Sequence, residues 1–134
     1  MFAHAKFWGR KRRQDPPKAY TLGISDFYGR DFVVTPDVLI PRPETELLCR
    51  MALDVAAERQ IDILDLCTGS GCIAWTVALE CPQAEVTAVD ISDGALAVAA
   101  GQEFEYDNAP KFIKADVLAG PVEGLGTFDM ILSN

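Results

Sequence analysis

The segment "DLCTGSGCIA", residues 65–74, holds the residues best suited to ligand chemistry. It follows an apolar run typical of a buried strand and leads into a run typical of a helix. Gly69 and Gly71 permit positive φ angles and let a ligand approach the backbone closely. Loops of this kind, at the carboxyl ends of strands in an open α/β sheet, are where ligands bind. We therefore predict a cofactor-binding loop made of Cys67, Thr68, Gly69, Ser70 and Gly71.

The spacing of this loop also fits the fingerprint of an adenosine-containing cofactor. Gly69, Gly71 and Ala74 satisfy the pattern G-x-G-x-x-G/A, and Asp90 lies roughly 20 residues further on, where a ribose-binding acid belongs. A carboxylate at the end of the second predicted strand can accept two hydrogen bonds from a ribose diol. The pattern alone leaves a nicotinamide-dependent oxidoreductase open, which would bind NADH.

Two further aspartates favour S-adenosylmethionine as the cofactor. Asp65 directly precedes the loop, where its carboxylate would repel a pyrophosphate and attract the ammonium and sulfonium groups of S-adenosylmethionine. Asp116 ends the third predicted strand and could accept a hydrogen bond from an adenine amino group. The alternative for each aspartate is a helix cap or a turn residue. Their occurrence together, beside a glycine loop, favours the binding site.

The elements that must position these residues alternate between strand and helix. Strands are expected over 61–66, 84–90, 111–116 and 128–132, with helices over 71–80 and 92–106. This alternation implies right-handed crossovers and an α/β fold, with a parallel sheet covered by helices on both faces.

Two elements are expected before this alternation. The segment 24–34 predicts a β-hairpin with a type II′ turn at Gly29-Arg30. A proline-punctuated loop then leads into a helix that starts at Pro43 and extends to about Arg59. Apolar residues at helical spacing predict its buried face: Leu47, Leu48, Met51, Ala52, Val55 and Ala56.

Charge is divided unevenly along the 134 residues. Residues 1–18 hold six basic side chains and one acidic one, whereas residues 19–134 hold six basic and nineteen acidic ones. We interpret residues 1–18 as a basic segment, and we favour a solvated segment over one that binds RNA. Residues 19–134 are interpreted as one domain that includes the hairpin. An acidic body of this kind argues against direct DNA binding.

Composition excludes several other classes. No apolar run approaches the roughly 18 residues of a membrane span, and no secretory signal is apparent, so a cytoplasmic protein without a membrane partner is expected. The four cysteines have no C-x-x-C spacing, and His4 is the single histidine, which predicts neither a metal site nor a histidine-based catalytic set.

Several motifs resemble a known family. "DLCTGSGCIA", "AVDIS" and "KADVL" are similar to the cofactor half of class I S-adenosylmethionine-dependent methyltransferases. "VLIPRPETELL", the preceding "FYGRDFVV" and the terminal "ILSN" resemble the peptide chain release factor glutamine methyltransferases of the HemK/PrmC family. The resemblance implies a Rossmann-like sheet of about four parallel strands preceded by a hairpin. It also implies N5-methylation of the glutamine in the Gly-Gly-Gln motif of a release factor, the expected protein partner.

The resemblance assigns roles to individual residues. Cys67 to Gly71 would wrap the methionine part of S-adenosylmethionine, although the family more often has glycine at Cys67. Asp90 would hold the ribose, and Asp116 with Val117 would flank the adenine. Asn134 would be the catalytic residue, accepting a hydrogen bond from the side-chain amide of the substrate glutamine and lying beside the cofactor.

The resemblance further implies a piece of a longer enzyme. The family has a helical amino-terminal domain, a second half of the sheet, and Pro-Pro-Tyr after the residue that matches Asn134. Two alternatives therefore remain open: an N-methyltransferase acting on adenine or RNA, and a catalytically inactive fragment that binds the cofactor. The strand ending at Asn134 would be an open sheet edge, which predicts self-association.

Overall fold

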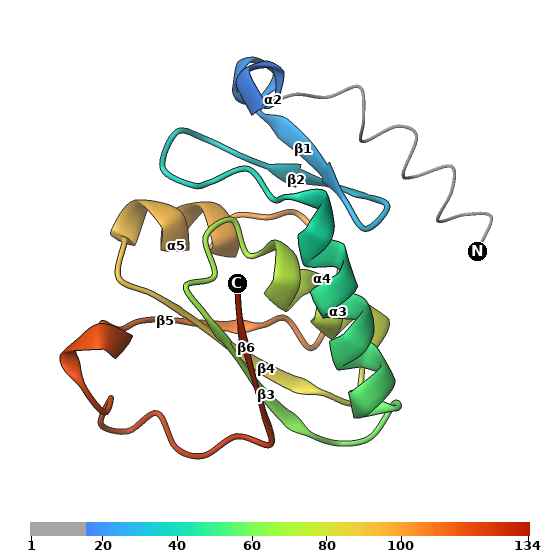
Figure 1. The fold of residues 1–134 in the computed structure, drawn as a ribbon, viewed down its shortest axis with the longest axis vertical. Coiled ribbons are helices and arrows are strands. Elements are labelled where there is room, and N and C mark those ends of the chain that lie inside the picture. The colour runs from blue at the N-terminus through green and yellow to red at the C-terminus, as the bar shows by residue number, and fades with distance from the viewer. Residues whose placement is uncertain (1–15) are drawn as a thin grey trace.

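The computed structural model describes residues 16–134, which form a four-stranded parallel sheet and a separate antiparallel hairpin (Figure 1). Most of the basic segment 1–18 lies outside the described residues, and the boundary predicted at residue 18 falls within helix α2 (Pro16–Leu22). The sheet order is β5-β4-β3-β6, so the chain adds strands to one side of β3 before returning to the other. The remaining elements, with their bounds, are β1 (Ile24–Phe27), β2 (Arg30–Val33), α3 (Pro43–Ala56), β3 (Asp62–Leu66), α4 (Cys72–Glu80), β4 (Glu85–Asp90), α5 (Asp93–Ala100), β5 (Lys111–Lys114), the 3-10 helix η1 (Val117–Ala119) and β6 (Met130–Ser133).

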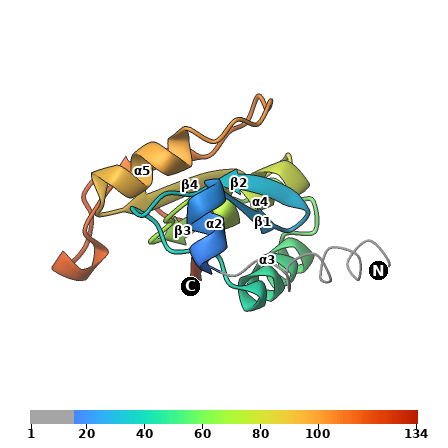
Figure 2. The same cartoon turned by 90° about the horizontal axis from the view of Figure 1, so that it is seen from above.

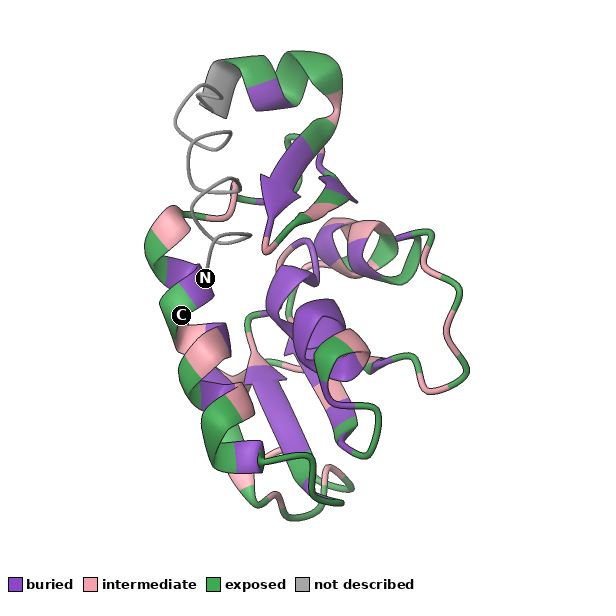
Figure 3. Ribbon diagram, turned by 90° about the vertical axis from the view of Figure 1, so that its right-hand side faces the viewer, coloured by how far each residue is buried: buried purple, intermediate pink, exposed green. Residues whose placement is uncertain are grey.

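The predicted parallel sheet is confirmed, with β3 at its centre. Asp65 of β3 pairs with Ala88 of β4 on one side and with Leu132 of β6 on the other. Because side chains alternate along a strand, these three residues point to the same face. Ile63, Ala88 and Leu132 belong to one buried cluster with the apolar residues of α4. Figure 3 shows buried residues along α4 and the central strands of the sheet.

The three α-helices that follow the hairpin form one layer. The Trp75 indole of α4 donates a hydrogen bond to the Ala99 carbonyl of α5 at 2.9 Å, and α3 packs against α4. Figure 1 shows these helices on one side of the sheet and the connection from β5 to β6 on the other. Figure 2, from above, shows α5 and α3 at opposite ends of the helical layer, with α4 between them. Helices on both faces were expected, but within residues 16–134 the second face carries only this connection with η1.

Helix α3 buries only part of the predicted face: Ala52 and Ala56 are buried as predicted, and Leu48 packs against the core. Its buried residues are Thr45, Glu46, Cys49, Ala52 and Ala56. Leu47, Met51 and Val55 are 57–60% exposed. The prediction counted only apolar residues, whereas the buried Glu46 accepts a hydrogen bond from the Tyr28 N–H through Oε2 at 2.8 Å. A polar contact with the hairpin thus helps to set the rotation of the helix, and the helix ends at Ala56, short of Arg59.

The hairpin forms where expected, but its turn is shifted by one residue. Phe27 pairs with Arg30, which leaves Tyr28 and Gly29 as the two turn residues. Both have positive φ, 50° and 81°, as a type I′ turn requires, so the predicted type II′ turn at Gly29-Arg30 is wrong. Phe27 and Phe32 pack edge to face with their ring centroids 6.2 Å apart and contribute to the core.

Helix α5 is shorter than predicted because the chain leaves it at Gly101. Residues 102–110 are irregular up to β5, although a helix was expected to Tyr106. Phe104 lies 5.1 Å from the Phe32 ring and 5.3 Å from the Trp75 ring, so tertiary aromatic contacts hold this segment. Among the described helices, none has the length and apolar character of a membrane span.

Candidate functional site

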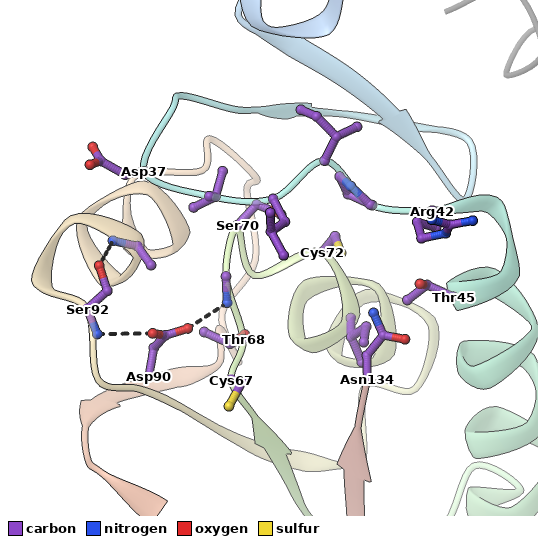
Figure 4. Close-up of a pocket in the computed structure, with 17 residues that line it drawn as sticks. Asp37, Arg42, Thr45, Cys67, Thr68, Ser70, Cys72, Asp90, Ser92 and Asn134 are labelled. Atoms are coloured by element: carbon purple, nitrogen blue, oxygen red, sulfur yellow. Dashed lines mark hydrogen bonds between the residues drawn. The ribbon is translucent and has the colours of Figure 1, made fainter. Parts of the chain in front are cut away.

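A cavity of about 320 Å³ opens at the carboxyl edge of the parallel sheet (Figure 4). Its floor is the loop 67–70 with the first residues of α4, and its sides are Asp90, Ser92 and Ala95. Residues 37–42 and Thr45 form the opposite wall, and Asn134 lies at the end of β6. Parallel strands place their carboxyl ends together, so residues distant in sequence meet here, as predicted for a ligand site.

The glycine loop is held by main-chain contacts to the neighbouring strand. The Thr68 N–H donates to the Val89 carbonyl at 2.9 Å, and the Gly69 N–H donates to Asp90 Oδ2 at 3.0 Å. The Gly71 N–H donates to the Thr68 carbonyl at 2.9 Å and closes the turn before α4. These bonds connect the ends of β3 and β4, so the protein's own groups hold the loop in this conformation.

The two loop glycines serve different needs. At Gly69, φ is +57° and no atom lies within 4 Å of the position that a Cβ would occupy, which leaves room for a ligand against the backbone. At Gly71, φ is +83° and a Cβ would lie 3.0 Å from the Ala99 Cβ and 3.1 Å from the Trp75 Cδ1. Gly69 therefore suits ligand approach, and Gly71 permits close packing of α4 on α5.

Ser70 adds a polar group that still needs a partner. The residue is 2% exposed and lines the cavity, yet its Oγ has no hydrogen-bond partner among the described residues. A buried hydroxyl without a partner costs free energy, and a polar ligand group in the cavity would remove that cost. Ser70 thus supports a polar ligand at this loop.

Asp90 lies beside the cavity with both carboxylate oxygens engaged. Oδ2 accepts from the Gly69 N–H, and Oδ1 accepts from the Ser92 N–H, each at 3.0 Å (Figure 4). A carboxylate has about four acceptor positions, so these two bonds leave two for a ligand. The carboxylate is thereby oriented by the backbone and remains able to bind a diol.

Asp65 lies beneath the loop and does not line the cavity. It is 1% exposed, and the Thr68 hydroxyl donates to its Oδ2 at 2.7 Å. Burial raises the pKa of Asp65 from 3.8 to about 7, while the Thr68 hydrogen bond opposes that rise and the nearby Asp90 carboxylate adds to it. Asp65 thus holds Thr68 directly and can act on a cation in the cavity only through space.

This buried carboxyl predicts a pH-dependent effect of Asp65→Asn on stability. With a folded pKa near 7 and an ordinary unfolded pKa, the folded wild type binds the extra proton between about pH 4 and pH 7, so its stability falls as pH rises through that window. Asp65→Asn has no such titrating group and lacks this loss. We therefore expect the free energy of unfolding of the variant minus that of wild type to be roughly 3 kcal/mol more favourable to the variant at about pH 8 than at about pH 5. Urea unfolding at both pH values measures the difference; an equal difference at both would contradict the prediction.

Asp116 and Val117 lie outside the cavity lining. Asp116 is exposed and caps η1, since its Oδ1 accepts from the Leu118 N–H at 3.1 Å. The segment nevertheless stays at the same sheet edge, because the Ala115 N–H donates to the Asp90 carbonyl at 3.0 Å. The structure thus shows a capping contact for Asp116, and adenine contacts of Asp116 and Val117 stay predictions.

The wall formed by residues 37–42 was missing from the predicted site. Val38 and Ile40 line the cavity together with Arg42, and the Tyr20 hydroxyl donates to the Val38 carbonyl at 2.8 Å. Thr45, at the start of α3, is drawn beside Asn134 in Figure 4. A long proline-containing loop before a helix was the available signal, but nothing in its residue types indicated that it would fold over the glycine loop.

Cys67 has an unusual backbone for a residue with a side chain. Its φ is +56°, in the left-handed region that favours glycine. We expect Cys67→Gly to raise the free energy of unfolding by about 0.5–1 kcal/mol, because glycine removes this strain and loses part of the gain to its more flexible unfolded chain. Thermal unfolding of both proteins measures the difference. Cys67→Ala keeps the Cβ and is the matched control, for which no gain in the free energy of unfolding is expected.

The comparisons with known proteins agree with the fold and the loop. Residues 63–134 match the family model described as a methyltransferase domain. The chain belongs to this methyltransferase domain family.

Within that family it is similar to release factor glutamine methyltransferases, as the motifs predicted. It is 46% identical over 125 residues to the one from Koribacter versatilis, which covers 92% of this chain and 44% of the relative. It is 44% identical to the one from Bordetella pertussis, covering 98% of this chain and 50% of the relative. The chain thus spans about half the length of these curated relatives.

Solved structures resemble the fold at lower identity. A magnesium protoporphyrin IX methyltransferase from Synechocystis PCC 6803, with bound SAH, matches with a TM-score of 0.53 and 18% identity, over 67% of this chain and 40% of that one. A coclaurine N-methyltransferase matches with a TM-score of 0.51 and 22% identity, over 65% of this chain and 26% of that one. They support the methyltransferase-type α/β fold.

Proposed function

We propose that this chain is the cofactor-binding part of an enzyme that transfers a methyl group from S-adenosylmethionine to the N5 atom of a glutamine in a release factor. The observation that carries the proposal is the cavity that brings together the glycine loop, Asp90 and Asn134. Relatives named release factor glutamine methyltransferase, 46% and 44% identical over more than nine tenths of the chain, support the choice of substrate. The expected substrate is the glutamine of a Gly-Gly-Gln motif.

The residues present fit S-adenosylmethionine. The space over Gly69 accepts a ligand against the backbone, and the unpartnered Ser70 Oγ offers a hydrogen bond. The two free acceptor positions of Asp90 suit a ribose diol. Among the described residues that line the cavity, Arg42 is the one basic side chain, so the site suits a cationic cofactor better than a pyrophosphate. This favours a methyltransferase over a nicotinamide-dependent enzyme.

The chain's own residues would act mainly by binding and alignment. When bound, S-adenosylmethionine supplies an activated methyl group. The amide nitrogen of glutamine is a weak nucleophile because its lone pair is delocalised into the carbonyl. Asn134 Oδ1 would accept a hydrogen bond from that amide and hold the nitrogen toward the cavity, and a cofactor seated between the wall 37–42 and the loop 67–70 would displace water from it. Alignment and desolvation would then supply the catalysis, and the proton that the amide nitrogen loses on methylation would leave to solvent without a dedicated base.

Methyl transfer from labelled S-adenosylmethionine tests the proposal. The chain is incubated with a release factor, with the same factor carrying alanine in place of the Gly-Gly-Gln glutamine, and with an adenine-containing RNA. Label in the first sample alone supports the proposal. Label in RNA would instead show the nucleic-acid N-methyltransferase. Cofactor binding by calorimetry without any transfer would show an inactive binding fragment.

The open edge of the sheet supports a further part of this proposal. Within residues 16–134, β6 pairs only with β3, so one of its edges is free for another strand. We expect the chain to self-associate through this edge, and light scattering measures it; a monodisperse monomer would contradict the expectation. Cytoplasmic location and the absence of direct DNA binding stay predictions.

A further inference from the structure

Gln102 is a buried polar residue that the cofactor site described above does not include. It is 6% exposed and lies just after α5, in the irregular segment that sequence patterns assigned to a helix. Its amide Nε2 donates to the Val33 carbonyl at 2.8 Å and to the Ser70 carbonyl at 3.0 Å. Its Oε1 accepts from the Val33 N–H at 2.8 Å. One side chain therefore makes three main-chain hydrogen bonds to two distant segments.

These two segments lead into opposite sides of the cavity. Val33 is the last residue of β2, and the chain continues through residues 34–36 into the wall 37–42. Ser70 belongs to the glycine loop that forms the floor. The Gln102 amide pairs with both main-chain groups of Val33, as a neighbouring strand would, and its second N–H reaches the floor. The side chain therefore links the floor to the end of β2, from which the chain continues into the wall that would enclose a ligand.

The chemistry of this position requires a primary amide. Both N–H groups and the oxygen are used, each by a main-chain group of opposite character. A carboxylate could not donate to the two carbonyls. An apolar side chain would remove the hydrogen bonds that Gln102 makes to all three main-chain groups. Because the bond to Ser70 is buried, its loss would leave a carbonyl unsatisfied beside the ligand.

We propose that Gln102 is a positioning residue that sets the spacing between the glycine loop and the wall 37–42, and thereby the affinity for the cofactor. The identity of the ligand rests on the proposed function above. The link itself rests only on the three hydrogen bonds, which join the end of β2 to the glycine loop through one side chain.

Two variants of the 134-residue chain test the link. Gln102→Met keeps the length of the side chain and removes all three hydrogen bonds. Gln102→Glu keeps the acceptor for the Val33 N–H and removes only the donors. It therefore replaces Gln102→Met in the binding experiment if that variant folds poorly. We expect each to weaken S-adenosylmethionine binding by about tenfold in calorimetry, performed where circular dichroism shows the variant folded.

Asn108→Ala is the matched control. The Asn108 side chain also makes two hydrogen bonds to main-chain carbonyls, those of Pro82 and Ala84 at 3.2 and 2.7 Å, but it does not line the cavity. We expect this variant to lower the Tm while leaving the affinity within about twofold of wild type. Equal affinity loss in Asn108→Ala and Gln102→Met would show a merely structural role and overturn the proposal.

Hydrogen exchange without ligand separates this proposal from the proposed function. In Gln102→Met we expect amides in 67–71 and 34–42 to exchange about tenfold faster than in wild type, with α3 unchanged. If wild type binds no S-adenosylmethionine but the variant shows this exchange pattern, the link stands and the cofactor assignment fails. Unchanged exchange in both segments, or unchanged affinity in a folded variant, would overturn the link.

Discussion

Asp90→Ala is expected to weaken S-adenosylmethionine binding by roughly a hundredfold or more, because hydrogen bonds to a charged group contribute roughly 1.5–3 kcal/mol each and two are lost. The substitution removes the two acceptor positions that suit the ribose. It also removes the contacts at 3.0 Å with the Gly69 and Ser92 N–H groups, which orient the glycine loop and the start of α5. Isothermal titration calorimetry of the 134-residue chain measures the loss.

Two variants make this result specific. Asp93→Ala removes a neighbouring carboxylate whose contact is an exposed ion pair with Lys114 at 3.0 Å, and Asp93 does not line the cavity. Its affinity should stay within about twofold of wild type, since exposed ion pairs contribute little. Asp90→Asn keeps one acceptor oxygen and should fall between wild type and alanine. Unchanged affinity in Asp90→Ala would contradict the ribose assignment.

Gly71→Ala is expected to produce the largest loss of stability, about 3 kcal/mol of unfolding free energy. Part of the loss comes from the positive φ of +83°, and part from a Cβ placed 3.0 Å from the Ala99 Cβ and 3.1 Å from the Trp75 side chain. Relief of that overlap would push α4 away from α5 and disturb the hydrogen bond from Trp75 to Ala99.

Gly124→Ala is the control that separates strain from packing. Gly124 has a similar φ of +79°, but no atom lies within 4 Å of the position that its Cβ would take, so only the backbone cost of about 1 kcal/mol is expected. Urea unfolding of both variants gives the two values. Equal losses would show that α4 and α5 can separate without cost, contrary to the tight contact at Gly71.

Local patterns were sufficient for the parallel sheet and the glycine loop. The apolar runs that end in Asp65 and Asp90 are strands in the structure, and the intervening glycines form the predicted loop. These features depend on residues close together in sequence: alternation along a strand, and glycine where φ must be positive. That the loop and Asp90 lie at one edge of the sheet followed from the rule that parallel strands end together.

Patterns failed where a distant partner decided the outcome. Leu47, Met51 and Val55 have the spacing of a buried face, yet α3 is rotated so that they are exposed and Glu46 reaches the Tyr28 N–H. The helix expected up to Tyr106 stops at Ala100, because the residues that follow make contacts with β2, the glycine loop and Trp75 instead of extending a helix. Propensity is a weak prior against such contacts.

By itself the sequence determined the class of fold, the glycine loop and the aspartates at the ends of the strands, because each depends on short-range periodicity and on the conformational freedom of glycine. Only the tertiary structure decided that Asp65 is buried beneath the loop, that residues 37–42 form the opposite wall, and that Gln102 joins Val33, at the end of β2, to Ser70. The last two are contacts between segments about 30 or more residues apart, for which local residue types carry no signal.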